Sequence, residues 1–137
     1  NHDPIYTRNR VRGHILPLLK TYNPSIIAAL GRTARICAEE DALIENLIDQ
    51  VWPTVVQHHA TAMVFQRANF VQLHPALQRR VLRRAARSLV ADVELEAKHL
   101  NAALAAVQTR RRRVQLPREL WLYVMPEELR LIREDTA

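Results

Sequence analysis

The sequence has 137 residues, enough for one domain with a hydrophobic core or for two small lobes. Its net charge is +6, because 20 lysine and arginine residues outnumber 14 acidic ones. No run of about 18 apolar residues is present, which excludes a membrane-spanning helix. The single cysteine, Cys37, excludes an internal disulfide.

Arginine supplies almost all of the positive charge, since Lys20 and Lys98 are the two lysines. A guanidinium group binds phosphate oxygens in a bidentate manner and stacks on bases, so this bias favours a nucleic-acid partner. A GC-rich genome, which also raises the arginine content, is an equally weighted explanation. Cys37 is expected to be buried in a helix and fits a cytoplasmic location. Because the sequence does not begin with methionine, we expect it to be a piece of a longer protein.

The first predicted helix covers residues 6–22 and combines an apolar stripe with a cationic start. At about 100° per residue, Arg8 and Arg12 share one face and Arg10 points elsewhere. Cations near a helix N-terminus oppose the helix macrodipole. This local cost indicates that the arginines serve a partner, and a phosphate group is the expected kind. The stripe, expected to be buried, consists of Val11, Ile15, Leu18 and Tyr22.

A second helix is predicted to start at Asn23 and Pro24, with Asn23 as its cap. Pro53 predicts the end of this helix near Val51 or Trp52. Its second half is acidic and is expected to turn away from any RNA. The acidic residues are Glu39, Glu40, Asp41, Glu45 and Asp49. The apolar stripe comprises Ile27, Leu30, Ala34, Cys37, Ile44, Leu47, Ile48 and Val51.

A short strand is predicted near Ala62–Phe65, where bulky and β-branched residues occur together. His74 and Pro75 then open a third helix that reaches about Val90. One arc of this helix is apolar, and the opposite arc carries arginines with no acid before Asp92. Such a cluster favours contact with RNA phosphates, and a plain solvated surface is the alternative. The arginines are Arg79, Arg80, Arg83, Arg84 and Arg87.

The last part of the sequence predicts a fourth helix and a small sheet. Asp92 is the expected cap of this helix, which ends near Thr109. Alternating apolar residues from Val114 to Leu131 predict short antiparallel strands. The fold class is therefore mainly α (α+β), with about four helices and a small antiparallel β element at the C-terminal end. Between helix and strands lies a basic run that could reach a phosphate or form an exposed linker: Arg110, Arg111, Arg112 and Arg113.

Catalytic and metal-binding patterns are not recognisable in the sequence. His58 and His59 are adjacent, which directs their rings to different faces, and no cysteine or histidine recurs at zinc-finger spacing. Two distant glycines cannot form a phosphate-binding loop. No Ser-His-Asp or Cys-His arrangement is apparent, so we expect no metal site and an inactive chain when it is alone. Trp52 and Trp121 could stack on bases, although packing at the edge of a core is the favoured role.

Three stretches of the sequence form a pattern together. The first runs through Arg8-Asn9-x-x-Arg12, Leu16-Pro17-x-Leu19 and Asn23-Pro24. The other two are Pro75–Leu82 and Val114–Pro117, so the pattern covers nearly the whole chain. It resembles the bacterial tRNA(Ile)-lysidine synthases, in which the first motif joins an N-terminal ATP-pyrophosphatase domain to a helical domain. The chain departs from this family at Arg118-Glu119, where relatives often carry glycine.

The resemblance implies that residues 1–22 are a linker helix from a missing catalytic domain. Residues 23–137 would form a helical tRNA- or substrate-binding domain with a small C-terminal sheet. Such enzymes use ATP, with Mg, to ligate lysine onto C2 of the wobble cytidine of tRNA(Ile) with a CAU anticodon. ATP would bind in the missing domain, so no cofactor is expected in this chain. By the same resemblance, Arg8, Asn9 and Arg12 would face phosphate of a nucleotide or of the tRNA, and both arginine clusters would bind the tRNA backbone.

Two other classes of function stay open. A general nucleic-acid-binding module would use the same arginines without selecting one tRNA. A protein-interaction or dimerisation module would direct them at an acidic protein and expose a large apolar patch, with weak salt dependence. The expected partners are therefore tRNA(Ile) and the parent's ATP-pyrophosphatase domain, with a homodimer as an alternative and no membrane contact.

Overall fold

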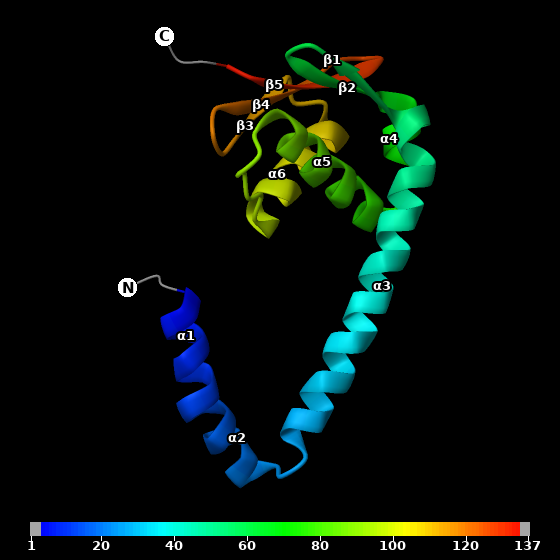
Figure 1. Ribbon diagram of the computed structural model, residues 1–137. Coiled ribbons are helices and arrows are strands. Elements are labelled where there is room, and N and C mark those ends of the chain that lie inside the picture. The colour runs from blue at the N-terminus through cyan, green and yellow to red at the C-terminus, as the bar shows by residue number, and fades with distance from the viewer. Residues whose placement is uncertain (1–3, 135–137) are drawn as a thin grey trace. The chain divides into compact units, whose positions relative to one another are not determined.

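The structure of the chain is a computed structural model that describes residues 4–134 (Figure 1). The first three residues of the predicted linker helix lie outside the described residues. The contacts divide the chain into two compact units, unit 1 at Asn1–Leu43 and unit 2 at Ile44–Ala137. The boundary between the units falls inside a helix. The functional division at residue 22 stays a prediction.

The described part of unit 1 is helical. Three segments follow one another without a break: α1 (Pro4–Arg10), the π-helix η1 (Val11–Ile15) and α2 (Leu16–Tyr22). This run confirms the first predicted helix. The side-chain Oδ1 of Asn23 accepts a hydrogen bond of 3.0 Å from the Ser25 amide, and α3 begins at Ile26. The second helix was predicted to start at Pro24 with Asn23 as its cap, but a turn at Pro24 and Ser25 delays its start to Ile26.

The helix α3 (Ile26–Val55) continues through Pro53 into unit 2, so its predicted end near Val51 or Trp52 is wrong. Proline lacks the amide that would donate to the carbonyl four residues earlier, but only two helical residues follow it. The lost hydrogen bond therefore lies in the last turn. Burial of Ile48 and Val55, which are 0% and 2% exposed, favours continuing the helix against this cost.

Unit 2 is built around one antiparallel sheet with the strand order β1-β2-β5-β4-β3. The strands are β1 (Val56–His59), β2 (Ala62–Gln66), β3 (Arg113–Leu116), β4 (Leu120–Val124) and β5 (Glu128–Arg133). The strand predicted near Ala62–Phe65 is confirmed as β2, whereas β1 was not expected. β2 pairs with β5 in a register that places Phe65 opposite Leu129. The middle of the chain and its C-terminal strands thus form a single sheet.

Three further helices complete unit 2: α4 (Arg67–Gln72), α5 (Pro75–Leu89) and α6 (Ala97–Thr109). The helices α5 and α6 lie against the same face of the sheet (Figure 1). The core between them contains Leu82, Leu122 and Leu131, all at most 1% exposed. The rings of Phe65 and Phe70 meet edge to face at 5.7 Å beside this layer. The predicted fold class, mainly α with a small antiparallel sheet, is confirmed.

The start of α6 differs from the prediction. Its N-cap is Glu96 and not Asp92, and His99 accepts a hydrogen bond of 3.1 Å from the Glu96 amide in a capping box. Residues 93–96 have no regular secondary structure, and Val93 and Leu95 are 1% and 3% exposed. A helix over these positions would direct Val93 and Leu95 to different sides. Packing of both into the core therefore delays the helix.

Unit 1 leaves its predicted apolar stripes exposed. Leu18 is 57% exposed, Tyr22 is 82% exposed and Leu30 is 46% exposed. Cys37 is exposed as well, so its predicted burial is wrong. Only the second half of the α3 stripe, from Ile44 onward, contributes to the core. None of the helices formed by residues 4–134 combines the length and the apolar character needed to cross a bilayer.

Candidate nucleic-acid interface

The five predicted arginines lie on α5, and the cap, the first turn and the buried arc of this helix determine where they point. His74 caps the helix, because its Nδ1 accepts a hydrogen bond of 3.2 Å from the Ala76 amide, and Pro75 occupies the first turn. The apolar arc opposite the arginines packs into the core as predicted, and its last member, Leu89, is half-buried. Its central members Val81, Leu82, Ala85 and Ala86 are at most 1% exposed. The rotation of the helix, and with it the direction of the arginines, is thereby determined by the core.

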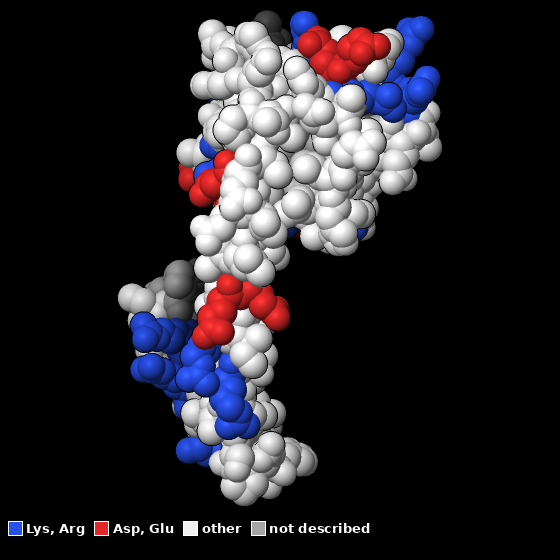
Figure 2. All heavy atoms as spheres, turned by 90° about the vertical axis from the view of Figure 1, so that its right-hand side faces the viewer, with Lys and Arg blue, Asp and Glu red and all other residues white. Residues whose placement is uncertain are grey.

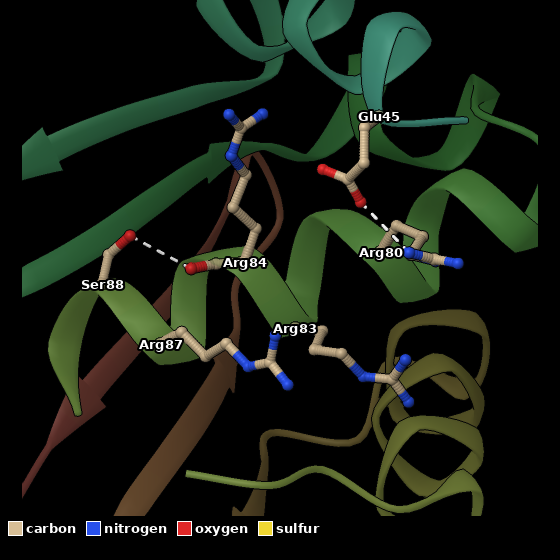
Figure 3. A pocket seen from close by; sticks show the side chains of 6 residues that line it. All are labelled: Glu45, Arg80, Arg83, Arg84, Arg87 and Ser88. Atoms are coloured by element: carbon tan, nitrogen blue, oxygen red, sulfur yellow. Dashed lines mark hydrogen bonds and ion pairs between the residues drawn. The ribbon is translucent and has the colours of Figure 1, made fainter. Parts of the chain in front are cut away.

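Two of the arginines pair with acids of α3. Arg80 Nη1 lies 3.1 Å from Glu45 Oε1, and Arg84 Nη1 lies 2.6 Å from Asp49 Oδ1. Figure 3 shows Arg80 turned toward Glu45. The acidic second half of α3, expected to turn away from RNA, therefore places two carboxylates beside the arginine face. The guanidinium group of Arg84 also lies 5.0 Å from the ring centre of Trp52, in a cation–π contact.

Two more arginines contact the segment that leads into α6 and α6 itself. Arg83 donates a hydrogen bond of 3.1 Å to the main-chain carbonyl of Leu95, and Arg79 donates one of 3.3 Å to Asn101 Oδ1. Arg87 is exposed and makes no hydrogen bond or ion pair with the residues that the structure describes. A shallow hollow of about 280 Å³ lies among these groups (Figure 3). It is lined by Glu45, Arg80, Arg83, Arg84, Arg87 and Ser88.

The positive charge of this face is reduced by its neighbours, because Glu45 and Asp49 pair with two of the five guanidinium groups and Glu94 and Glu96 line a hollow with Arg83 and Arg87. The pairs are solvated: the side chains of Arg84 and Asp49 are 42% and 60% exposed. Ion pairs of this kind contribute little to stability, about 0–1 kcal/mol. A phosphate oxygen could therefore take the place of either carboxylate at small cost. The contacts within the chain hold the arginines in defined positions and leave them able to bind an anion.

The second cluster, Arg110–Arg113, divides into separate roles. Arg110 ends α6 in the left-handed conformation, with φ 53°. Arg113 opens β3, and its guanidinium group lies 4.5 Å from the ring centre of Trp121. Arg111 and Arg112 are exposed between them. The cluster therefore lies between a helix and a strand as predicted, and one member is drawn onto the sheet.

The opening motif lies in unit 1. Arg8 and Asn9 belong to α1, and Arg12 belongs to the π-helix, and all three side chains are exposed. Arg10 lies 5.9 Å from the ring centre of Tyr6. Short π-helical segments are frequent at functional sites. Figure 2 shows basic side chains gathered over unit 1, with acidic side chains farther along α3. The members of this motif therefore lie on consecutive turns of one helical run.

Sequence reasoning missed the partners of the arginines. The pairs Glu45/Asp49 and Arg80/Arg84 each have the spacing of one helical turn, which allows two ladders of opposite charge to face each other. This matching spacing was a usable signal. Trp52 and Trp121 are half-buried, as expected at the edge of a core, and each carries a stacked arginine. Among residues 4–134, no three histidine, cysteine, aspartate or glutamate side chains gather as a metal site would require.

Comparison with known proteins adds an independent observation. No protein-family model matches the chain. The tRNA(Ile)-lysidine synthase of Dehalococcoides mccartyi is 35% identical over 115 residues, which are 82% of this chain and 24% of the relative. The proteins of the same name from Thermosynechococcus vestitus and Gloeobacter violaceus are each 35% identical. The matches cover 60% and 61% of this chain and 24% and 25% of the relatives.

This chain spans about a quarter of the length of these relatives. The resemblance predicted from the three sequence stretches is confirmed, and the chain is homologous to a part of the tRNA(Ile)-lysidine synthases.

Proposed function

We propose that this chain is the tRNA-binding part of a tRNA(Ile)-lysidine synthase and that the arginine face of α5 binds the tRNA backbone. The observation that carries the proposal is the set of five guanidinium groups that the core of unit 2 turns to one side. Arginine forms paired hydrogen bonds to phosphate oxygens, and a fixed basic face is typical of nucleic-acid-binding proteins. Arg110–Arg113 would extend the same contact.

The whole enzyme would use ATP with Mg to ligate lysine onto C2 of the wobble cytidine in tRNA(Ile) with a CAU anticodon. In this proposal the nucleotide binds in an ATP-pyrophosphatase domain outside this chain. Arg8, Asn9 and Arg12 would face phosphate of the nucleotide or of the tRNA. A guanidinium group held there would stabilise the charge that develops during adenylation of the cytidine. The chain alone should therefore release no AMP when it is given ATP, lysine and the tRNA.

The exposed apolar residues of unit 1 favour a protein contact as a second role for this chain. Leu18, Ile27 and Leu30 are between 44% and 57% exposed, although they follow the spacing of a buried helix face. Apolar residues that follow one side of a helix and stay exposed are candidates for an interaction site. We propose that the ATP-pyrophosphatase domain covers it. A second copy of the chain is the alternative, and the mass measured by analytical ultracentrifugation distinguishes the two.

The tRNA contact is tested by the salt dependence of binding. Arg80, Arg83 and Arg84 are unsuitable for substitution, because their replacement would also break contacts within unit 2. Arg87 and Arg79 are the better pair, because Arg87 makes no such contact and Arg79 donates a single exposed hydrogen bond of 3.3 Å to Asn101, and both would be replaced by glutamine. The matched control replaces Arg32 and Arg35, which are exposed arginines of α3 outside both clusters. Each double variant removes the same charge.

Binding of tRNA to each variant would be measured from about 50 to 300 mM salt. Each phosphate contact contributes roughly 0.7–0.9 to the slope of log affinity against log salt concentration, so loss of two contacts should reduce the slope by about 1.5–2. The control should keep the slope within about 0.5 of the unsubstituted chain. Equal slopes for the two double variants, with unchanged circular dichroism, would show that the arginine face is an ordinary solvated surface.

A further inference from the structure

The sheet of unit 2 has a second face that no described helix covers (Figure 1). Side chains of its strands alternate between the core and this open face. The strand pairing places Arg113, Tyr123, Arg130 and Val64 in one row across β3, β4, β5 and β2. The neighbouring row contains Trp121, Ile132 and Ala62. The open face therefore carries two aromatic side chains next to each other on β4, with arginines on both adjoining strands.

The aromatic side chains of this face are held in place by polar contacts. The guanidinium group of Arg113 lies 4.5 Å from the ring centre of Trp121 and 6.0 Å from that of Tyr123. Arg113 Nη1 also donates a hydrogen bond of 3.2 Å to the Tyr123 hydroxyl, which donates in turn to Glu134. A planar guanidinium group stacked on an indole by one face still presents its other face to solvent. That face and the half-buried rings form a platform on which another flat group could stack.

Beside this platform, the open face has a hollow of about 500 Å³. Its polar lining includes His59, Thr61, Glu128 and Arg130, and Arg130 Nε lies 2.6 Å from Glu128 Oε1. These groups offer hydrogen-bond donors and acceptors above a floor that includes Val64. Ligand sites combine apolar walls with a few polar groups in this way. The hollow continues the row that begins at Arg113 and Tyr123.

We propose that the open face of the sheet binds unpaired bases of RNA by stacking on Trp121, Tyr123 and Arg113. Single-stranded RNA is recognised by aromatic side chains and arginine planes on exposed surfaces such as sheets. The basic residues Arg110–Arg112 lead directly into β3, so the backbone of the same strand would find cations at the edge of the platform. The inference rests on the proposed function for RNA as the partner, and it adds a contact to bases that the phosphate-binding face of α5 does not make.

A protein partner fits this face less well. Tryptophan, tyrosine and arginine are common in protein interfaces too, but glutamate is depleted there, and Glu128 lies on this face beside Arg130. The two carboxylates nearest the platform are already engaged, Glu128 by Arg130 and Glu134 by the Tyr123 hydroxyl. The two aromatic rings therefore lie beside a positively charged group, Arg113, and this charge is complementary to that of RNA.

The fluorescence of Trp121 gives a direct test. Trp52 and Trp121 are the two tryptophans of the chain, so Trp52→Phe leaves Trp121 as the single reporter. This variant would be titrated with a single-stranded octamer of uridine that carries a fluorescent label at one end. Anisotropy of the label reports binding, and tryptophan emission reports stacking. We expect emission from Trp121 to be quenched in parallel with binding.

A second measurement does not depend on the tryptophan variant. Tyr123→Leu in the otherwise unchanged chain should weaken octamer binding by roughly 5- to 150-fold, the range for losing one base–aromatic stack. The salt slope should stay unchanged, because stacking releases no counterions. The matched control is Tyr22→Leu, which removes an exposed tyrosine of unit 1 and should leave binding unchanged.

The outcomes separate this inference from the proposed function. One outcome would contradict the stacking site and support the phosphate site. In it, the α5 variant has a smaller salt slope, and Trp121 emission does not change when the octamer is saturating. Binding that Tyr123→Leu and Tyr22→Leu leave equally unaffected would also overturn it. A change in sedimentation mass on Tyr123→Leu, with RNA affinity retained, would assign the face to a second copy. Absence of any RNA binding at about 50 mM salt would sink both proposals.

Discussion

The helix α5 in unit 2 and the helical run of α1–α2 in unit 1 both carry an apolar side and several arginines. In α5, Leu82 is 1% exposed and four of five arginines contact other parts of unit 2. In α2, Leu18 is 57% exposed. The same comparison holds within the predicted stripe of α3, where Ile48 is 0% exposed and Ile27 is 44% exposed. Hydrophobic periodicity thus identifies which side of a helix is to be covered, and it does not reveal whether the covering surface belongs to the same chain.

The largest test of this comparison is truncation of one leucine in each unit. Leu82→Ala should lower the free energy of unfolding by about 2–5 kcal/mol, because it opens a cavity between α5 and the sheet. Leu30→Ala in α3, at 46% exposure, should change it by less than about 0.5 kcal/mol. Urea denaturation followed by circular dichroism measures both. A loss of 2 kcal/mol or so for Leu30→Ala would show that unit 1 has a core of its own.

Local rules predicted the elements whose determinants lie within a few residues. His74 and Pro75 open α5 as expected, and the alternation after Arg113 forms the last three strands. Elements that depend on distant contacts were missed. Val56–His59 carries two polar histidines and becomes a strand only because β2 pairs beside it, with Val56 opposite Phe65. Tertiary pairing overrides weak strand propensity at such sites.

The candidate site shows the same division between local and distant determinants. The arc of arginines on α5 follows from helical periodicity alone, and so does the buried arc opposite. The pairing of Arg80 and Arg84 with Glu45 and Asp49 joins residues 35 positions apart. The matching spacing of the two pairs allows them to face each other, but periodicity does not show that α3 and α5 lie side by side. The register of the sheet, which brings Arg113 beside Tyr123, is likewise a property of the folded chain.

A turn with two positive φ angles offers a second test, because its strain lowers the stability that the packing of unit 2 provides. Arg118 and Glu119, between β3 and β4, both have φ 61°, a region that favours glycine. Arg118→Gly should raise the free energy of unfolding by about 1 kcal/mol through relief of this strain. Arg112→Gly, at an arginine without positive φ, should bring no such gain. If the two glycine variants have equal melting temperatures, the turn is not strained in solution.

The ion pairs of α5 test whether its arginines or its apolar arc hold it in place. A double-mutant cycle of Arg84→Ala and Asp49→Ala should give a coupling energy of about 0.2–1 kcal/mol, since both side chains are solvated. This value is well below the effect of Leu82→Ala, so the core determines the position of α5. The cycle is measured by urea denaturation of the four proteins. Coupling of 3 kcal/mol or so would mean that the pair behaves as a buried one.

The smallest expected effect concerns the fully solvated start of α6. A hydrogen bond from Lys98, together with its charge, lowers the pKa of the Glu96 carboxyl below its ordinary value of 4.5. A lowered pKa in the folded chain means that the charged form adds stability above pH 4.5 and that this contribution fades as the pH falls through the lowered pKa. Glu96→Gln keeps a side-chain oxygen for the cap and removes the charge. Its melting temperature should therefore fall slightly less than that of the unsubstituted chain between pH 6 and pH 3, roughly the interval over which such a carboxyl titrates. Calorimetry across this range compares the two proteins. Parallel curves would mean that the Lys98 contact is too exposed to contribute to stability, as surface contacts often are. The stability of unit 2 relative to unit 1 would then come from its apolar core and not from this charge.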